Sequence, residues 1–175
     1  MSDRWKSTST PYLQPRAQGE ADAWTQEAGS RGTQRLTEVA TQAPPAVIGA
    51  TLGLTAGELA VVRRRVMIFD GSPVELTDSY YPLHVAAGTP LAEHAKIRGG
   101  APTLLANLGY ESHRVIEDVA QRTASPEEAA ALELEPGTAV LTLLRVSLTR
   151  SEQPIEASLM VMKGPRSLRY EMEVG

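Results

Sequence analysis

The strongest pattern of apolar and polar positions lies in the middle of the chain, over residues 60–82. The stretch AVVRRRVMIFD (60–70) is rich in β-branched residues and predicts a strand, and VELTDSYY (74–81) predicts a second strand. Between them, the tetrapeptide DGSP (70–73) is typical of a tight turn. Pro82 ends the second strand, because proline has no amide hydrogen to donate to a neighbouring strand. These residues therefore predict an antiparallel hairpin.

A second predicted hairpin lies near the C-terminus, and a helix signal precedes each hairpin. Strands are expected over 138–150 and 155–163, joined by the turn SEQP. The tetrapeptide SPEE (125–128) predicts a helix start, because it provides a serine N-cap, a proline at the first helical position and a glutamate three residues after the cap. Two prolines similarly open a short helix expected over 44–52.

The remaining elements follow from weaker patterns. Helices are expected over 20–28, 90–94 and 102–107, and strands over 34–41, 112–122 and 167–174. Residues 1–19 are rich in Ser, Thr, Pro and Gln and show no periodicity, so they are expected to form an arm or linker. Residues 20–175 are expected to form one domain.

The two hairpins and the helices before them resemble each other. A Leu-x-Leu-x-x-Gly stop ends both helices, as LGLTAG (52–57) and as LELEPG (132–137), and a strand follows each stop. With one residue inserted in the second turn, the aligned pairs are Arg65 with Arg145, Pro73 with Pro154 and Glu75 with Glu156. This internal repeat predicts two similar halves around one antiparallel sheet.

Composition narrows the class of protein. The chain has 175 residues, of which 42% are hydrophobic, and this suits one globular domain. A net charge of −4 argues against a nucleic-acid-binding surface over the whole chain. The absence of cysteine excludes disulfides, thiol catalysis and zinc ribbons. No apolar run approaches the roughly 20 residues of a membrane span, and no signal peptide is evident, so a cytoplasmic location is expected.

The usual motifs for metals, phosphates and nucleophilic catalysis are not found. His84, His94 and His113 are far apart in sequence and have no ligand spacing. The pair Gly99-Gly100 follows Lys96, whereas a P-loop needs its lysine after the glycines. No serine lies in a Gly-x-Ser-x-Gly turn. We therefore expect no metal, no cofactor and no catalytic residue.

Two arginines on one face of the strand over 60–70 are the first candidates for binding. Strand alternation places Arg63 and Arg65 on the same face as Met67. An arginine on a core face needs an anionic partner. Either Arg63 lies at a solvated strand end and Arg65 pairs with a carboxylate of the protein, or a pocket arginine captures the carboxylate or phosphate of a ligand.

Glu156 is the second candidate. It shares a strand face with Ser158, Met160 and Met162. Its carboxylate could pair with one of the repeated arginines inside the protein, or it could accept a hydrogen bond from a ligand hydroxyl or amine. The sequence leaves both interpretations open.

These residues resemble a known family. Residues 61–75, followed by SYYP (79–82), are similar to the first hairpin of the UTRA domain, the effector-binding module of GntR-type bacterial transcription regulators of the HutC subfamily. The resemblance covers the chain from about residue 20 to the C-terminus, and actinobacterial members are the most similar. Further matching segments are 22–24, 32–35, Gly99-Gly100, Gly109, 124–137, 153–156 and 166–172.

The resemblance implies a fold and partners. It implies a chorismate-lyase-like α+β fold, in which an antiparallel sheet with flanking helices forms a ligand cleft. It also implies a homodimer that responds to a small-molecule effector by repositioning two winged-helix heads. Residues 1–19 cannot supply a recognition helix and a basic wing, so DNA is expected to be bound only through a head absent from this chain. Trimming at the linker is the favoured explanation, and a gene that encodes a free sensor is the other.

The resemblance also implies pocket positions. Arg65 matches the first arginine of the family's Arg-x-Arg pair, and Glu156 matches its late glutamate. The expected effector-binding residues are Arg65, Glu156, Arg63, Thr77, Met67, Trp24, Thr25 and Met162. The departures from the family pattern are Met67 for the second arginine, Thr77 for the hairpin glutamate, Ala101 and Pro102 for a serine and a tyrosine, and Met162 for a late tyrosine. A larger, partly apolar effector with one anionic or polar handle is expected.

Two alternatives to a ligand sensor stay open. One is an enzyme of the related lyase fold, in which Arg65 would hold the carboxylate of a chorismate-like substrate and Glu156 would act as the acid. The other is a dimerisation module with a degenerate pocket, which the departures from the family pattern would explain.

Overall fold

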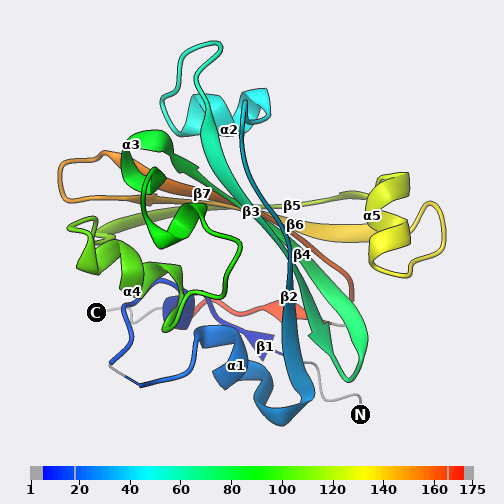
Figure 1. Cartoon of the computed structure of the whole chain (residues 1–175). Coiled ribbons are helices and arrows are strands. Elements are labelled where there is room, and N and C mark those ends of the chain that lie inside the picture. The colour runs from blue at the N-terminus through cyan, green and yellow to red at the C-terminus, as the bar shows by residue number, and fades with distance from the viewer. Residues whose placement is uncertain (1–5, 18, 165, 172–175) are drawn as a thin grey trace.

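The computed structural model describes residues 6–17, 19–164 and 166–171, and this part of the chain is built around an antiparallel sheet of six strands (Figure 1). In spatial order the strands are β2 (Gly32–Gln42), β3 (Ala60–Phe69), β4 (Ser72–Pro82), β7 (Pro154–Met162), β6 (Ala139–Leu148) and β5 (Arg114–Thr123). Two short strands, β1 (Lys6–Ser7) and β8 (Ser167–Leu168), pair in parallel beside the sheet. The α+β class expected from the sequence is confirmed.

The strand order confirms the internal repeat. The returning strands of the two hairpins, β4 and β7, pair at the centre, and each half continues outward with its first hairpin strand and one edge strand. Arg65 lies opposite Thr77 in one half, as Arg145 lies opposite Ser158 in the other. The two halves are therefore related by a local twofold axis through the β4–β7 pair.

The turn between β3 and β4 is tighter than the sequence suggests. Phe69 already pairs with Ser72, which leaves a two-residue turn in which Asp70 and Gly71 both have positive φ angles, of 49° and 78°. Such a turn matches the twist of a hairpin. Pro73 consequently lies inside β4, where a bulge tolerates its missing amide hydrogen, and the expected four-residue turn is wrong.

Short helices connect the strands. They are α1 (Ala23–Ala28), α2 (Ala46–Thr51), α3 (Leu83–Ala86), α4 (Gly100–Asn107) and α5 (Pro126–Ala131), with 3-10 turns η1 (Thr10–Tyr12), η2 (Gly29–Arg31) and η3 (Pro90–Ala92). The predicted capping box at Ser125 and Glu128 is confirmed. The sequence did not predict α3, and the helix expected over 90–94 is only a 3-10 turn. The strand expected over 167–174 is reduced to β8, and residues 172–174 lie outside the described part of the chain.

Different helices cover the two faces of the sheet. On one face, α2 packs on Val62 and Tyr80, and α5 packs on Val140 and Val161. On the other face, apolar residues of α3, η3 and α4 pack around a buried cluster that includes Tyr81. The second face also carries Arg63 and Arg65 of β3. None of the described helices has the length and apolarity required to span a membrane.

Candidate functional site

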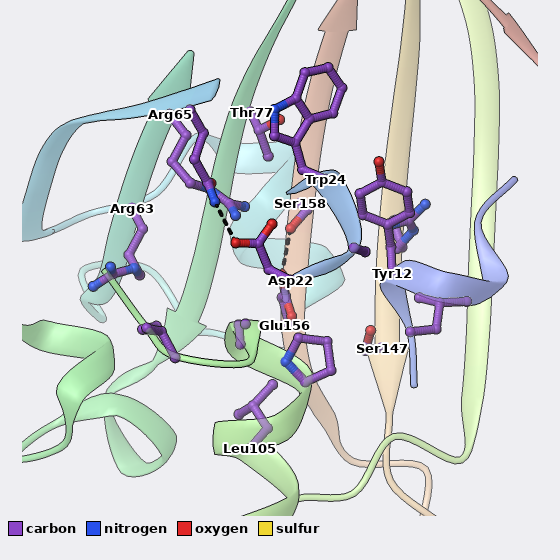
Figure 2. Close-up of a pocket in the computed structure, with 18 of the residues that line it drawn as sticks. Tyr12, Asp22, Trp24, Arg63, Arg65, Thr77, Leu105, Ser147, Glu156 and Ser158 are labelled. Carbon is purple, nitrogen blue, oxygen red and sulfur yellow. Dashed lines mark hydrogen bonds between the residues drawn. The ribbon is translucent and has the colours of Figure 1, made fainter. Parts of the chain in front are cut away.

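A cavity of about 230 Å³ lies on the face of the sheet that carries Arg63 and Arg65 (Figure 2). Its floor is formed by β3, β4, β7 and β6, and its walls by α1, α4 and the N-terminal segment, which we define as residues 6–17. The polar and charged residues of the floor are Arg63, Arg65, Glu75, Thr77, Arg145, Ser147, Glu156 and Ser158. The apolar lining includes Tyr12, Trp24, Leu36, Met67, Pro102, Leu105 and Met160.

Arg65 is a half-buried cation that has no carboxylate partner among the described residues. Its Nη2 donates a hydrogen bond to Ser79 Oγ at 2.9 Å, while its Nε is buried and has no partner among the described residues. On the neighbouring strand β2, the residue that pairs with Arg65 is Leu36, which is apolar and cannot neutralise it. In the other half of the repeat, Arg145 lies opposite Glu117 and its Nε donates to that carboxylate at 2.6 Å. The two aligned arginines therefore differ, because among the described residues a carboxylate neutralises Arg145 but not Arg65.

A line of hydrogen bonds joins Arg65 to Glu156 across the centre of the sheet. Ser79 Oγ lies 2.7 Å from Ser158 Oγ, and Ser158 donates to Glu156 Oε1 at 2.7 Å. Because Ser158 uses its only hydrogen for the carboxylate, Ser79 must be the donor between the two serines. The hydroxyl of Tyr81 is close to this line, and burial together with the charge of Glu156 raises its pKa, so the phenol stays neutral.

Arg63 has a different role from the one expected. It is only 4% exposed, so the expectation of a solvated strand end is wrong. Its Nη1 donates to the carbonyls of Pro90, Leu91 and Glu93, and its Nη2 donates to that of Ala95. These donors hold the loop over 90–95 beside the cavity, and burial lowers the pKa of the guanidinium. Arg63 lines the cavity, but its Nη donors are used by the backbone.

Thr77 and Glu75 form a second polar group at the floor. Thr77 donates to Glu75 Oε1 at 2.6 Å, and the other carboxylate oxygen of Glu75 accepts from Arg166. Arg166 also contacts Glu27 of α1 at 3.2 Å. We did not predict Glu75 as a site residue, although its alignment with Glu156 in the repeat was a usable signal.

The other predicted residues divide between the cavity and its surroundings. Trp24 and Met67 line the cavity, and the indole Nε1 donates to the carbonyl of Thr33, which leaves the ring as an apolar surface. Thr25 is not among the residues that line the cavity. The hydroxyl and the amide of Thr25 both donate to the carboxylate of Asp22, the N-cap of α1. Met162 packs in a separate apolar cluster next to the cavity. The structure thus brings Arg65, Glu156, Arg63, Thr77, Met67 and Trp24 together and leaves out Thr25 and Met162.

Asp22 and Lys96 close one side of the cavity and were also missed. The Asp22 carboxylate accepts from Gln34 at 3.1 Å and pairs with Lys96 at 3.1 Å. Burial alone would raise the pKa of Asp22, but the hydrogen bonds of Thr25 and the charge of Lys96 outweigh burial and lower it. This pair connects α1 to the loop before α4.

The N-terminal segment is an ordered wall of the cavity. Ser9 donates to Glu117 at 2.9 Å and accepts from Arg145 at 3.0 Å. Tyr12 donates to Glu27 at 2.6 Å, and the amide of Arg16 donates to Thr103 at 2.9 Å. Most of the side-chain contacts that hold this segment are polar, which is typical of an element that opens at low free-energy cost.

The attachment of the N-terminal segment is expected to depend on Glu117. Burial would raise the pKa of Glu117, but hydrogen bonds from Ser9, Arg145 and Tyr170 lower it overall. A lowered carboxyl pKa gives stability that is complete above the ordinary value of 4.5 and is lost as the pH falls through the folded-state value. Glu117→Gln at neutral pH, or acid applied to the wild-type protein, should therefore loosen the segment.

Hydrogen exchange of the amides of residues 6–17, corrected for the intrinsic effect of pH, measures this loosening. We expect exchange several-fold faster in Glu117→Gln and in the wild-type protein below pH 4.5. The exposed Glu111 provides the control variant Glu111→Gln, which should exchange like the wild type. Unchanged exchange in Glu117→Gln would show that the segment is held by other contacts.

Comparisons with known proteins agree with this fold. The family model described as the UTRA domain matches residues 27–167. An uncharacterized HTH-type transcriptional regulator of Streptomyces coelicolor is 32% identical over 134 residues, which are 74% of this chain and 49% of the relative. The chain thus spans about half of the length of the curated relative that it matches.

Solved structures give the same result. The ligand-binding domain of a GntR-family regulator from Bordetella bronchiseptica has a TM-score of 0.70 and 26% identity, over 93% of this chain and 96% of that chain. The effector domain of PhnF from Mycobacterium smegmatis has a TM-score of 0.73 and 21% identity, over 92% of this chain and 99% of that chain, and supports the fold alone. The extent of the family match, together with the Streptomyces relative, shows that this chain belongs to the UTRA domain family.

Proposed function

We propose that this chain is the effector-sensing domain of a transcription regulator, and that its cavity binds a small molecule through Arg65. The observation that carries the proposal is the buried Nε of Arg65, which has no partner in the described residues. A buried donor of a charged group that has no partner is costly, so a protein retains one where a ligand supplies the missing anion. The guanidinium is suited to a carboxylate or phosphate, because its planar donors match both groups.

The other cations of the cavity support this choice of residue. Arg145 is neutralised by Glu117, and Lys96 is paired with Asp22. Arg63 bonds four backbone carbonyls. Arg16, the remaining cation of the lining, bonds Gln26 and the carbonyl of Pro11. Among the described cations of the cavity, Arg65 is therefore the one that offers an incoming anion a buried donor with no partner.

The relatives support a sensing function and extend the proposal to the whole regulator. The Bordetella structure is described as a ligand-binding domain and the PhnF structure as an effector domain. By analogy we propose a cytoplasmic homodimer of the HutC subfamily, in which residues 20–175 form the sensor and a winged-helix head reads DNA. The effector would change the affinity of the regulator for DNA only if the effector itself binds two states of the regulator with different affinities.

The size of the cavity refines the expected effector. Typical small-molecule sites have volumes of roughly 300–1,000 Å³. At about 230 Å³ this cavity is smaller, so it favours a compact effector over the larger one that the departures from the family pattern suggested. The apolar walls around a polar floor retain the expectation of a partly apolar molecule with an anionic handle.

A thermal-shift screen of the purified chain against small metabolic acids tests the proposal. At a free concentration one hundred times Kd, an effector adds about 2.7 kcal/mol to the free energy of unfolding. For a chain of this size that corresponds to a rise in Tm of roughly 5–10 °C. Arg65→Gln should weaken binding of the hit by about tenfold or more, because one or two charge-assisted hydrogen bonds are lost.

Arg64→Gln is the matched control for this experiment. Arg64 is the next residue of β3, lies on the opposite face and pairs with Glu38 and Asp78. It should leave the ligand-induced shift unchanged. A hit that stabilises Arg65→Gln as strongly as the wild-type protein would refute the assigned role of Arg65.

A further inference from the structure

The floor of the cavity carries a second charged group without an ionic partner. Within the described residues, no lysine, arginine or histidine lies within ion-pair distance of the Glu156 carboxylate, and its only hydrogen bond comes from Ser158. Arg65 lacks a carboxylate in the same way. In the part of the chain that the structure describes, Arg65 thus keeps an unused buried donor at Nε and Glu156 keeps unused acceptor positions, while Asp22 and Glu75, the other two carboxylates of the lining, are both paired with cations.

The two free charges are held close together. Three successive hydrogen bonds of 2.9, 2.7 and 2.7 Å connect them through Ser79 and Ser158. The two ends of this line, Arg65 Nη2 and Glu156 Oε1, are consequently roughly 8 Å apart at most, and the unused Nε and the rest of the carboxylate lie one or two bonds further on. One small molecule can reach both groups only if its acid and its donor are separated by very few bonds.

The chemistry of the two groups fixes which part of a ligand belongs at which end. Arg65 has an unused donor at Nε, and Glu156 has acceptor positions left, because its carboxylate accepts only from Ser158 among the described residues. A ligand must therefore bring an anionic acceptor to Arg65 and a hydroxyl or ammonium donor to Glu156. The apolar walls formed by Trp24, Leu36 and Leu105 require the rest of the molecule to be apolar.

From these constraints we infer that the effector is a small 2-amino or 2-hydroxy acid with an apolar side chain. Its carboxylate binds Arg65, and the amine or hydroxyl on the adjacent carbon donates to Glu156. The inference rests on the proposed function, since it names the chemical class that the sensing cavity takes. It goes further by assigning Glu156 to the ligand instead of to an internal ion pair.

Four compounds with the same phenyl group test the inference in the wild-type protein by isothermal titration calorimetry. They are L-phenylalanine, 3-phenyllactate, 3-phenylpropionate, which lacks the donor, and 2-phenylethylamine, which lacks the acid. We expect phenylalanine or phenyllactate to bind about tenfold or more tightly than the two incomplete compounds, because each of those leaves one charged group of the floor unpaired. This comparison needs no variant and does not depend on whether a substitution folds.

Two variants then separate the contributions. Glu156→Gln should remove the advantage of the donor-bearing acid while leaving the affinity for 3-phenylpropionate within about threefold, whereas Arg65→Gln should weaken every acid. Glu152→Gln is the matched control, because Glu152 is exposed and pairs with Arg114 outside the cavity. It should bind all four compounds like the wild-type protein.

The outcomes distinguish this inference from the proposed function. If 3-phenylpropionate binds as tightly as phenylalanine and phenyllactate, and binding still requires Arg65, the inference is wrong and the sensing function stands. If none of the four compounds binds the wild-type protein, the inference is also wrong, and the function then depends on whether other screened acids require Arg65. A Glu156→Gln variant that lowers stability without changing any affinity would identify Glu156 as an internal structural group.

Discussion

Replacing Arg166 by methionine is expected to lower the free energy of unfolding by about 3–5 kcal/mol. The Arg166 side chain is 5% exposed and lies between the carboxylates of Glu75 and Glu27, which are 8% and 16% exposed. Methionine retains much of the packing volume near Trp24 but leaves both buried carboxylates without their cation. The cost follows from this uncompensated burial of negative charge.

Urea unfolding of the wild-type protein and of Arg166→Met measures the effect. The control is Arg169→Gln, because Arg169 is 49% exposed and pairs with the exposed Glu171. It should cost less than about 1 kcal/mol. Adding Glu75→Gln to Arg166→Met should recover part of the loss, since one buried charge is then removed. A loss below about 1 kcal/mol in Arg166→Met would contradict the buried network.

Replacing Arg63 by methionine is expected to cost about 2–4 kcal/mol and to loosen the loop over 90–95. Four backbone carbonyls lose a charged donor, and the bond to the carbonyl of Leu91 is fully buried. A hydrogen bond to a charged group contributes roughly 1.5–3 kcal/mol, but part of the loss is offset because a buried cation is removed and the outer carbonyls can bind water.

Hydrogen exchange over residues 88–97 distinguishes this loop effect from general destabilisation. We expect these amides to exchange faster in Arg63→Met by a larger factor than the amides of the central strands β4 and β7. The matched control is Arg64→Met on the opposite face of β3, which should leave the exchange of this loop near the wild-type rate. Equal acceleration across the whole protein would argue against a specific role in the loop.

Local sequence patterns predicted most of the strands and the helix at α5, because those elements depend on residues that are adjacent in sequence. The hairpins, the capping box at Ser125 and the repeat are of this kind. Strand alternation also placed Arg63 and Arg65 on the cavity face. The turn at Asp70 and Gly71 was predicted two residues too long, because the place of Ser72 and Pro73 in β4 depends on the register of the whole hairpin.

The parts of the site that were missed depend on contacts between distant segments. Arg166 and Glu75 are 91 positions apart, and Ser79 and Ser158 are 79 apart, so no local pattern indicates either pair. The role of Arg63 was misjudged for a related reason. Its partners are backbone carbonyls, and these leave no signal in the identity of the residues that carry them.

Composition predicted an arm or linker over residues 1–19, and residues 6–17 of it are described by the structure. A segment rich in Ser, Thr and Pro is typical of a linker, yet here its hydroxyl groups bond to Glu117 and Glu27 and it forms one wall of the cavity. The polar residues that predicted an arm or linker are the ones that attach it to the domain.

The central claim is that Arg65 holds the anionic group of an effector in this cavity. A crystal structure of the domain with the strongest stabiliser from the acid screen tests it most directly. We predict an oxygen of the ligand's acid at about 2.7–2.9 Å from Arg65 Nε, with the apolar part of the ligand against Trp24 and Leu36. A ligand bound elsewhere, or one whose acid contacts Arg145 or Lys96 while Arg65 Nε stays unpaired, would contradict the claim.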